Sequence, residues 1–318
     1  MEFIDRLRDL LSDYGPHGFS GFIIVGILAA VIAVALYRSG GRRMTLIVAV
    51  LASAFFLLLG NLAIPLAILG VLAAFSLRVS RTGEDHWLAA RRFGIEGFIV
   101  IGGLAVYTVT RRLIQSEAEP AYAAADQIMA FEEALHLYVE PAMQSWALES
   151  DTVMRSFNSF YLFGYPAVVS AALLWLWATD EPNYRLLRNA FGVSILFALV
   201  TIALVPVAPP RLLPESGMID TIALYGAPHE FANEYAALPS LHVGWMTVTG
   251  IILARSIGGR VGWAIAALPG TLMLVTVIVT GNHFWFDGAV GIAFTLVPLL
   301  IMLMPRTGEA FRRSPQPA

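Results

Sequence analysis

Two histidines and an aspartate in the last third of the chain have the types and spacing for chemistry on phosphate. His242 follows Pro239-Ser240-Leu241, and Asp287 lies four residues after His283. Each histidine stands where an apolar run begins, which predicts a place in the first turn of a helix. The four-residue spacing puts His283 and Asp287 on one helix face. Because helix N-termini expose N–H groups that favour anions, these side chains predict a phosphate site.

The segment between the two histidines is expected to cross a membrane twice. The first apolar run extends from His242 to Ala254, and the second from Val261 to Thr280. Between them, Arg255–Arg260 contains a Gly-Gly turn. The second run has the ~20 residues that span a bilayer, whereas the first is shorter and needs its flanks to cross. A chain that crosses and returns brings both histidines to the same side of the membrane.

The chemistry expected of these side chains is transfer of a phosphoryl group through histidine. Asp287 would hold one imidazole nitrogen of His283 and leave the other unprotonated, free to attack phosphorus. His242 would protonate the leaving oxygen and later activate the acceptor. Two alternatives are a histidine that only packs against a carboxylate, and a metal site of two histidines and one carboxylate. Two such histidines on one side, where ionisable groups are costly, argue against packing alone.

Composition identifies the class of protein. Hydrophobic residues make up 58% of the 318 residues and charged residues 14%, and the mean hydropathy is +0.71. This balance is too apolar for a soluble domain, so we predict an all-α, polytopic integral membrane protein with the bilayer as a partner. The absence of cysteine excludes disulfides, thiolate catalysis and zinc–thiolate sites. Nothing in the net charge of −3 indicates nucleic acid as a partner.

The apolar runs predict about nine transmembrane helices. Residues 44–77 are apolar over 34 positions, too many for one ordinary span, and Gly60-Asn61 followed by Pro65 offers a turn between two short helices. Residues 78–92 are expected to form a basic, polar link. The nine spans are expected at 21–37, 44–59, 62–77, 93–110, 160–178, 189–207, 242–254, 261–280 and 283–304.

These spans divide into three expected domains. Residues 1–92 hold an interfacial helix at 2–14 and three extra membrane spans. Residues 93–304 form the membrane domain of six spans that carries the histidines. Residues 305–318 are a polar tail, which is expected to be disordered and cytoplasmic.

A stripe of apolar side chains within residues 111–156 predicts an amphipathic helix lying on the membrane surface. The opposite face carries Glu132, Glu133, His136 and Glu140. Glu132, His136 and Glu140 follow one another at four-residue steps, which suits a metal or a sugar headgroup, but a solvated helix face is the simpler interpretation. The apolar stripe consists of Ile128, Phe131, Leu135, Tyr138, Ala142 and Trp146.

The distribution of arginine predicts the orientation of the chain. All 20 basic residues are arginine, and with nine spans 14 of them fall on the side opposite the histidines and 6 on the histidine side. If residues 44–77 are one span, the count becomes 13 against 7. Because basic residues accumulate on the cytoplasmic side, both counts place the histidines on the extracytoplasmic face. For a bacterial protein this membrane would be the plasma membrane.

Short motifs around the histidines resemble a known family. Pro239-Ser240-Leu241-His242 and the His283-to-Asp287 spacing resemble the second and third motifs of the type-2 phosphatidic acid phosphatase superfamily. The branch that contains inositol phosphorylceramide synthase looks most similar. That branch also has a Pro-Pro-Arg element, here Pro209-Pro210-Arg211, and an Asn-x-Tyr-Ala-Ala element, here residues 233–237. The resemblance covers about residues 93–304.

The resemblance implies a fold and a mechanism. It implies a six-helix catalytic core, a phosphohistidine on His283, Asp287 as its orienting residue and His242 as acid and base. The expected substrate is a lipid phosphate or phospholipid, and neither a metal nor another cofactor is needed. Transfer to an acceptor alcohol and hydrolysis by water share the first half-reaction, so both remain open.

The sequence departs from the wider superfamily in its phosphate-binding cations. The chain has no lysine, so the Lys-x6-Arg-Pro first motif is absent, and Thr276 and Val277 stand where the third motif usually begins Ser-Arg. Arg211 is therefore the expected phosphate-binding cation, with Ser240 and Asn282 as further phosphate- or substrate-binding residues. The missing cations also suggest an alternative, a non-catalytic lipid-binding relative.

Overall fold

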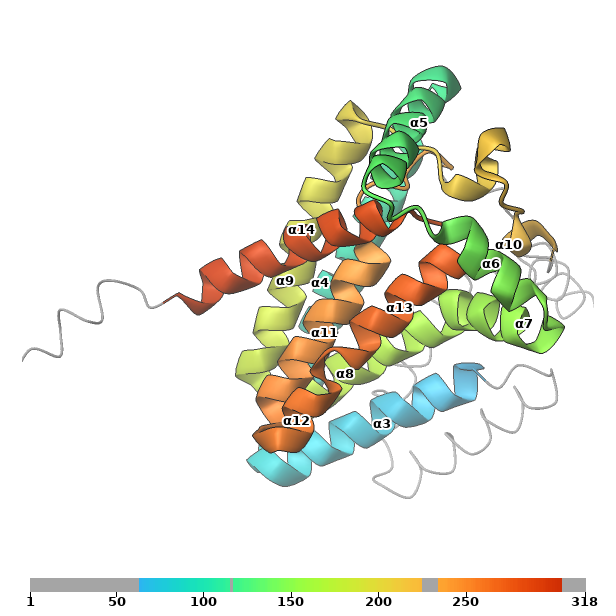
Figure 1. Cartoon of the computed structure of the whole chain (residues 1–318). Coiled ribbons are helices and arrows are strands. Elements are labelled where there is room, and N and C mark those ends of the chain that lie inside the picture. The colour runs from blue at the N-terminus through green and yellow to red at the C-terminus, as the bar shows by residue number, and fades with distance from the viewer. Residues whose placement is uncertain (1–62, 115–116, 225–233, 305–318) are drawn as a thin grey trace, which may run out of the picture. The chain divides into compact units, whose positions relative to one another are not determined.

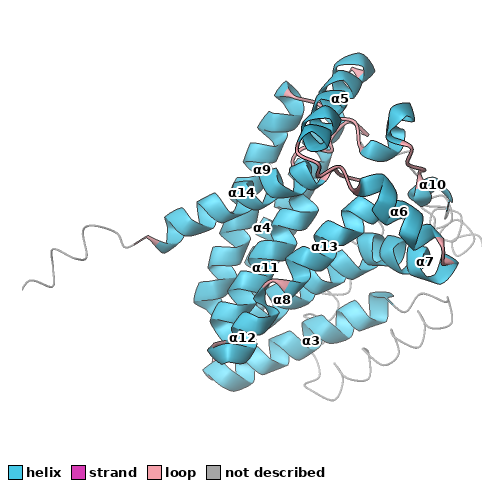
Figure 2. Cartoon of the chain, in the orientation of Figure 1, coloured by secondary structure: helices cyan, strands magenta, loops and turns pink. Residues whose placement is uncertain are grey.

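The computed structural model describes residues 63–114, 117–224 and 234–304, in which helices are joined by loops and the only β pairing is one isolated bridge between Val207 and Ala236 (Figure 2). The expected features at 2–14, 21–37, 44–59 and 305–318 lie outside the described residues. The helices are α3 (Ala63–Thr82), α4 (His86–Leu113), α5 (Ala118–Ala134), α6 (Glu140–Leu148), α7 (Asp151–Ser159), α8 (Tyr165–Thr179), α9 (Glu181–Leu204), α10 (Thr221–Leu224), α11 (Leu241–Ile257), α12 (Gly259–Ala266), α13 (Leu268–Val279) and α14 (Trp285–Leu303).

Four helical stretches among the described residues are long and apolar enough to cross a membrane. They are His86–Leu113, Asp151–Thr179, Glu181–Leu204 and Trp285–Leu303. Helices α11 and α13 are apolar but shorter. An all-helical chain with these stretches fits an integral membrane protein. The count of nine spans includes residues outside the described part, so it stays a prediction.

Contacts divide the chain into two compact units. The first contains the described residues up to Val106 together with Leu173–Glu181, and the second contains Tyr107–Ala172 and the described residues from Pro182 onwards. Both histidines, Asp287 and Arg211 belong to the second unit.

In the first unit, the structure of residues 78–92 differs from the predicted polar link, because Arg78 is buried. These residues were expected to form a polar link, but α3 continues to Thr82 and α4 begins at His86. The side chain of Arg78 is 3% exposed, and it forms ion pairs with Glu84 at 3.0 Å and Glu181 at 2.8 Å. Because its charge is neutralised by these carboxylates, the helix passes through Arg78 instead of ending there.

In the second unit, α11 packs against α12, α13 and α14 (Figure 1). Gly291 allows the backbones of α11 and α14 to come into direct contact. Any larger residue would place its Cβ 2.0 Å from the carbonyl oxygen of Ser240, which is too close. The helix predicted at 261–280 is instead two helices, α12 and α13, which meet at Ala267. Pro269 in the first turn of α13 explains the break, because proline supplies no N–H and disfavours a helical residue before it.

Two parts of the prediction for the segment between Ile128 and Trp146 are wrong: the helix is not continuous, and the glutamates opposite the apolar stripe are not solvated. Helix α5 ends at Ala134, and α6 begins only at Glu140. Leu135 is 48% exposed and Trp146 is 56% exposed, whereas Glu132 and Glu140 on the supposedly solvated face are fully buried. The buried carboxylates face backbone N–H groups of α14. Apolar side chains exposed on a membrane protein can face lipid, so the exposed Leu135 and Trp146 are compatible with the predicted place of this segment on the membrane surface, which stays a prediction.

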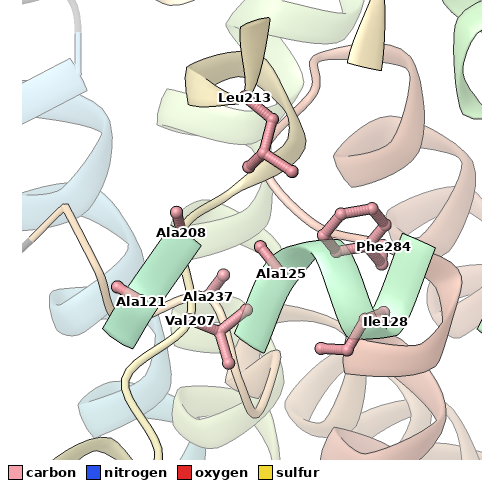
Figure 3. Packing of buried hydrophobic residues seen from close by; sticks show 8 residues of the cluster. All are labelled: Ala121, Ala125, Ile128, Val207, Ala208, Leu213, Ala237 and Phe284. Carbon is pink, nitrogen blue, oxygen red and sulfur yellow. The ribbon is translucent and has the colours of Figure 1, made fainter. Parts of the chain in front are cut away.

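A hydrophobic cluster packs the loops around the site against helix α5 (Figure 3). The N–H of Ala208 donates to the carbonyl of Ala121 at 3.1 Å, and the N–H of Ala237 donates to that of Val207 at 3.1 Å. Phe284, the residue after the second histidine, is fully buried in the cluster. Packing against α5 therefore fixes three loop segments at once. The cluster consists of Ala121, Ala125, Ile128, Val207, Ala208, Leu213, Ala237 and Phe284.

Candidate active site

The start of α11 positions His242. Ser240 is the N-cap of the helix, and His242 is its second residue, as the sequence predicted. The backbone N–H of Ser240 donates to the carbonyl of Asp287 at 2.9 Å, which ties the start of α11 to the first turn of α14. Ser240 is fully buried, and its hydroxyl makes no hydrogen bond within the described residues. The expected role of Ser240 in binding phosphate therefore remains a prediction.

His283 lies in the turn between α13 and α14, not in the first turn of a helix as predicted. Helix α13 ends at Val279, and the N-cap of α14 is Phe284. Gly281 has a φ of 68°, a left-handed conformation that favours glycine. The turn is closed by the N–H of Asn282, which donates to the carbonyl of Val277 at 2.9 Å.

A backbone carbonyl orients the ring of His283. Its Nδ1 lies 2.7 Å from the carbonyl oxygen of Ala237. Because a carbonyl only accepts hydrogen bonds, Nδ1 carries the proton and Nε2 keeps its lone pair. Burial lowers the pKa of His283 to about 3, and the positive charges of Arg211 and Arg111 act in the same direction. The imidazole is therefore neutral near pH 7 and has a free Nε2.

Asp287 caps the helix in addition to approaching His283. The carboxylate is fully buried, and its Oδ2 accepts the N–H of Phe284 at 3.0 Å. The same oxygen lies 3.5 Å from Nδ1 of His283. The predicted pairing is therefore present as a longer contact, while the carbonyl of Ala237 makes the shorter one. The sequence could not reveal this carbonyl, because any residue type supplies one.

The structure brings the two histidine rings together, with centroids 5.7 Å apart. Two tyrosines that the sequence analysis did not single out flank His242. The rings of Tyr161 and Tyr165 lie with their centroids 4.8 Å from the His242 ring. They belong to the stretch where a π-helical turn at Phe160–Gly164 joins α7 to α8. Such turns are frequent at functional sites, and the four-residue spacing of the tyrosines was the only sequence signal.

Arg211 is attached to the His283 turn by its backbone and its side chain. Its N–H donates to the carbonyl of Gly281 at 3.0 Å, and its Nη1 donates to Oδ1 of Asn282 at 2.5 Å. Its Nε lies 3.3 Å from Oδ2 of Asp220. The Nδ2 of Asn282 donates to Thr280 Oγ1 at 2.7 Å, so both ends of its amide are engaged. The expected role of Asn282 in binding phosphate or substrate stays a prediction.

A second arginine that the sequence analysis missed acts on the site. Arg111 stands near the C-terminal end of α4. Its positive charge is one of the causes that lower the pKa of His283. The only sequence signal was a pair of arginines at the end of an apolar run. The charge of Arg111 thus acts on His283 together with that of Arg211, the single cation expected.

The alternative of a metal site concerns His242, His283 and Asp287. Among the described residues, no group of three or more histidine and acidic side chains has the arrangement of a metal site. Nδ1 of His283 faces a backbone carbonyl and Oδ2 of Asp287 caps α14, so these two atoms are engaged within the protein. Glu132, His136 and Glu140 do not converge, because His136 is exposed in the loop between α5 and α6.

Comparison with known proteins supports the family indicated by the motifs. A family model described as PAP2 superfamily matches residues 126–301, more than half of the chain. The match includes His242, His283, Asp287 and Arg211. No curated protein and no solved structure matches the chain.

Proposed function

Because the chain belongs to the PAP2 superfamily, we propose that it is a membrane enzyme that transfers or hydrolyses the phosphoryl group or phospho-headgroup of a lipid. The observation that carries this proposal is the neutral ring of His283, whose proton lies on Nδ1 beside the Ala237 carbonyl. Its Nε2 is then a nucleophile in a site that also contains His242 and two arginines.

The first half-reaction would form a phosphohistidine. The lone pair of His283 Nε2 attacks phosphorus, and the bond between phosphorus and the leaving oxygen breaks. His242, in its protonated form, gives its proton to that oxygen. The proton on Nδ1 of His283 stays near Ala237 and Asp287, which stabilise the positive charge that forms on the ring.

The second half-reaction would release the group from histidine. Water or an acceptor hydroxyl loses its proton to His242 and attacks phosphorus, and the nitrogen–phosphorus bond breaks. The pair of electrons in that bond returns to Nε2 of His283. Arg211 and Arg111 would stabilise the negative charge on the phosphoryl oxygens in both steps. The mechanism needs no metal to generate the nucleophile.

The nature of the acceptor decides between hydrolysis and transfer. The Pro209-Pro210-Arg211 element and residues 233–237 resemble the branch with inositol phosphorylceramide synthase, which favours transfer of a phospho-headgroup to an acceptor lipid. For the fold, the same resemblance supports our proposal of a six-helix catalytic core that follows three further membrane spans. Tyr161 and Tyr165 beside His242 stand where an acceptor hydroxyl would meet the base.

The test is an assay of the purified protein with a panel of lipid phosphates and phospholipids, with and without acceptor lipids. We expect phosphate release or a new lipid, retained activity in EDTA, and inhibition by vanadate, which mimics five-coordinate phosphorus. Loss of activity on chelation that one divalent metal restores would favour the metal alternative. Binding of a lipid phosphate without turnover across the whole panel would favour the non-catalytic relative.

We propose that the site lies on the extracytoplasmic face, because 14 arginines are expected on the opposite side of the membrane and 6 on the side of the histidines. Two exposed positions give a matched test in this cysteine-free chain: Glu215, in the loop that carries Arg211, and Arg260, at the start of α12. In intact cells, Glu215→Cys should react with an impermeant thiol reagent, and Arg260→Cys should react only after lysis. The opposite pattern would reverse the orientation.

A further inference from the structure

The first turn of α14 is held by two glutamates from outside the helix. The N–H of Trp285 donates to Glu140 Oε1 at 3.0 Å, and the N–H of Phe286 donates to Glu132 Oε1 at 3.0 Å. The first N–H groups of a helix have no partner within the helix, so such contacts satisfy them. The negative charge also lies at the positive end of the helix dipole.

Both glutamates are placed where a carboxylate is costly. Glu132 and Glu140 are fully buried, whereas the neighbouring Glu133 is exposed. Burial of a carboxylate is unfavourable unless hydrogen bonds compensate for lost water. In each of the two glutamates, Oε1 accepts an N–H group of α14. The burial of the two glutamates is therefore explained by their hydrogen bonds with α14, and they do not form a solvated helix face.

The two carboxyl groups act on each other. Burial raises the pKa of both, and the charge of Glu140 raises that of Glu132 further. With the pKa of Glu132 raised to about 9, we infer that the pair holds at least one proton near pH 7. Asp287 from α14 and Tyr138 from the loop between α5 and α6 are the other titratable groups that face the pair.

We propose that Glu132 and Glu140 act together as positioning residues, which fix the first turn of α14 and thereby hold His283 in its reactive orientation. His283 is separated from Trp285 only by the buried Phe284, so a shift of the first turn moves its ring relative to the Ala237 carbonyl. The claim that this arrangement supports catalysis by His283 rests on the proposed function. The claim that the two carboxyl groups share a proton does not.

The catalytic part is tested by comparing amide with apolar replacements. Glu132→Gln and Glu140→Gln each retain a side-chain oxygen that accepts the N–H of α14. We expect their kcat to stay within about threefold of the wild type, whereas the corresponding leucine variants lose about 10- to 100-fold in kcat with little change in KM. The matched controls Glu133→Gln and Glu133→Leu should be unaffected.

The carboxyl pair is tested by thermal unfolding as a function of pH, which requires no activity. Because their folded-state pKa values are raised, these groups bind more protons folded than unfolded, so their contribution to stability is full below the ordinary carboxyl range and falls as pH rises. We expect the Tm of the wild type to fall from about pH 5 to about pH 9. The fall should be shallower in the Glu132→Gln/Glu140→Gln double variant.

Each outcome decides a separate claim. Leucine variants with wild-type kcat, or glutamine variants as impaired as leucine variants, would overturn the positioning role. If the leucine variants do not fold, the glutamine variants and the Tm profile still decide. The same Tm profile in wild type and double variant would overturn the shared proton. Absence of turnover in the wild type on every lipid would count against the proposed function and leave the Tm test of the pair valid.

Discussion

Replacement of His283 by alanine is expected to lower turnover by about a thousandfold or more while the protein still folds. His283 combines a neutral ring with a proton held on Nδ1 by a backbone carbonyl, and alanine removes the Nε2 lone pair that attacks phosphorus. The measurement is kcat on the best lipid of the panel, with folding followed by thermal unfolding in detergent.

An exposed histidine supplies the control for this variant. His136 lies in the loop between α5 and α6 with a φ of 56°, so His136→Asn is the matched change, because asparagine tolerates that conformation. We expect His136→Asn to keep wild-type turnover. Substantial activity in His283→Ala, with normal folding in both variants, would contradict a covalent intermediate on this residue.

The second large effect is expected at Arg211. Lysine keeps the positive charge but lacks the planar fork, so Arg211→Lys should lose about tenfold or more in kcat/KM, and Arg211→Ala about a hundredfold or more. The physical reason is that the guanidinium contacts Asn282 with Nη1 and lies beside Asp220 with Nε. These contacts orient the group for phosphate oxygens, and a single ammonium does not reproduce them.

The Arg211 variants need a control that separates charge from position. Arg185 is exposed on α9, so Arg185→Lys and Arg185→Ala should leave kcat/KM unchanged. Arg211→Lys with near-normal kcat/KM would show that charge alone is sufficient. Near-normal kcat/KM in Arg211→Ala would mean that Arg111 or the helix N-termini hold the phosphate without it.

The sequence was sufficient to predict the two histidines on one side of a helical hairpin. That inference needed only local patterns, namely apolar runs, a Gly-Gly turn and a four-residue spacing. The position of His283 just before the helix, instead of within it, depends on the turn at Gly281 and on burial of Phe284. Such boundaries are set by packing, which a single sequence does not display.

The burial of the glutamates on α5 and α6 has a different cause. Next to lipid an apolar side chain can point outwards, so the exposure of Leu135 and Trp146 leaves the opposite face of this segment to pack inside the protein. The buried position of Glu132 follows from an N–H of α14 more than a hundred residues away in sequence. Arg111 and the two tyrosines beside His242 were missed for the same reason, because tertiary contacts bring them to the site.

The most direct test of the central claim is to trap the covalent intermediate. The protein is mixed with a turned-over lipid substrate, quenched in alkali, which preserves phosphohistidine, and digested, and the modified residue is located by mass spectrometry. We predict a phosphoryl or phospho-headgroup adduct on His283 that is labile in acid and absent from His283→Ala. Turnover with no adduct on His283, or with the adduct on another residue, would contradict the account.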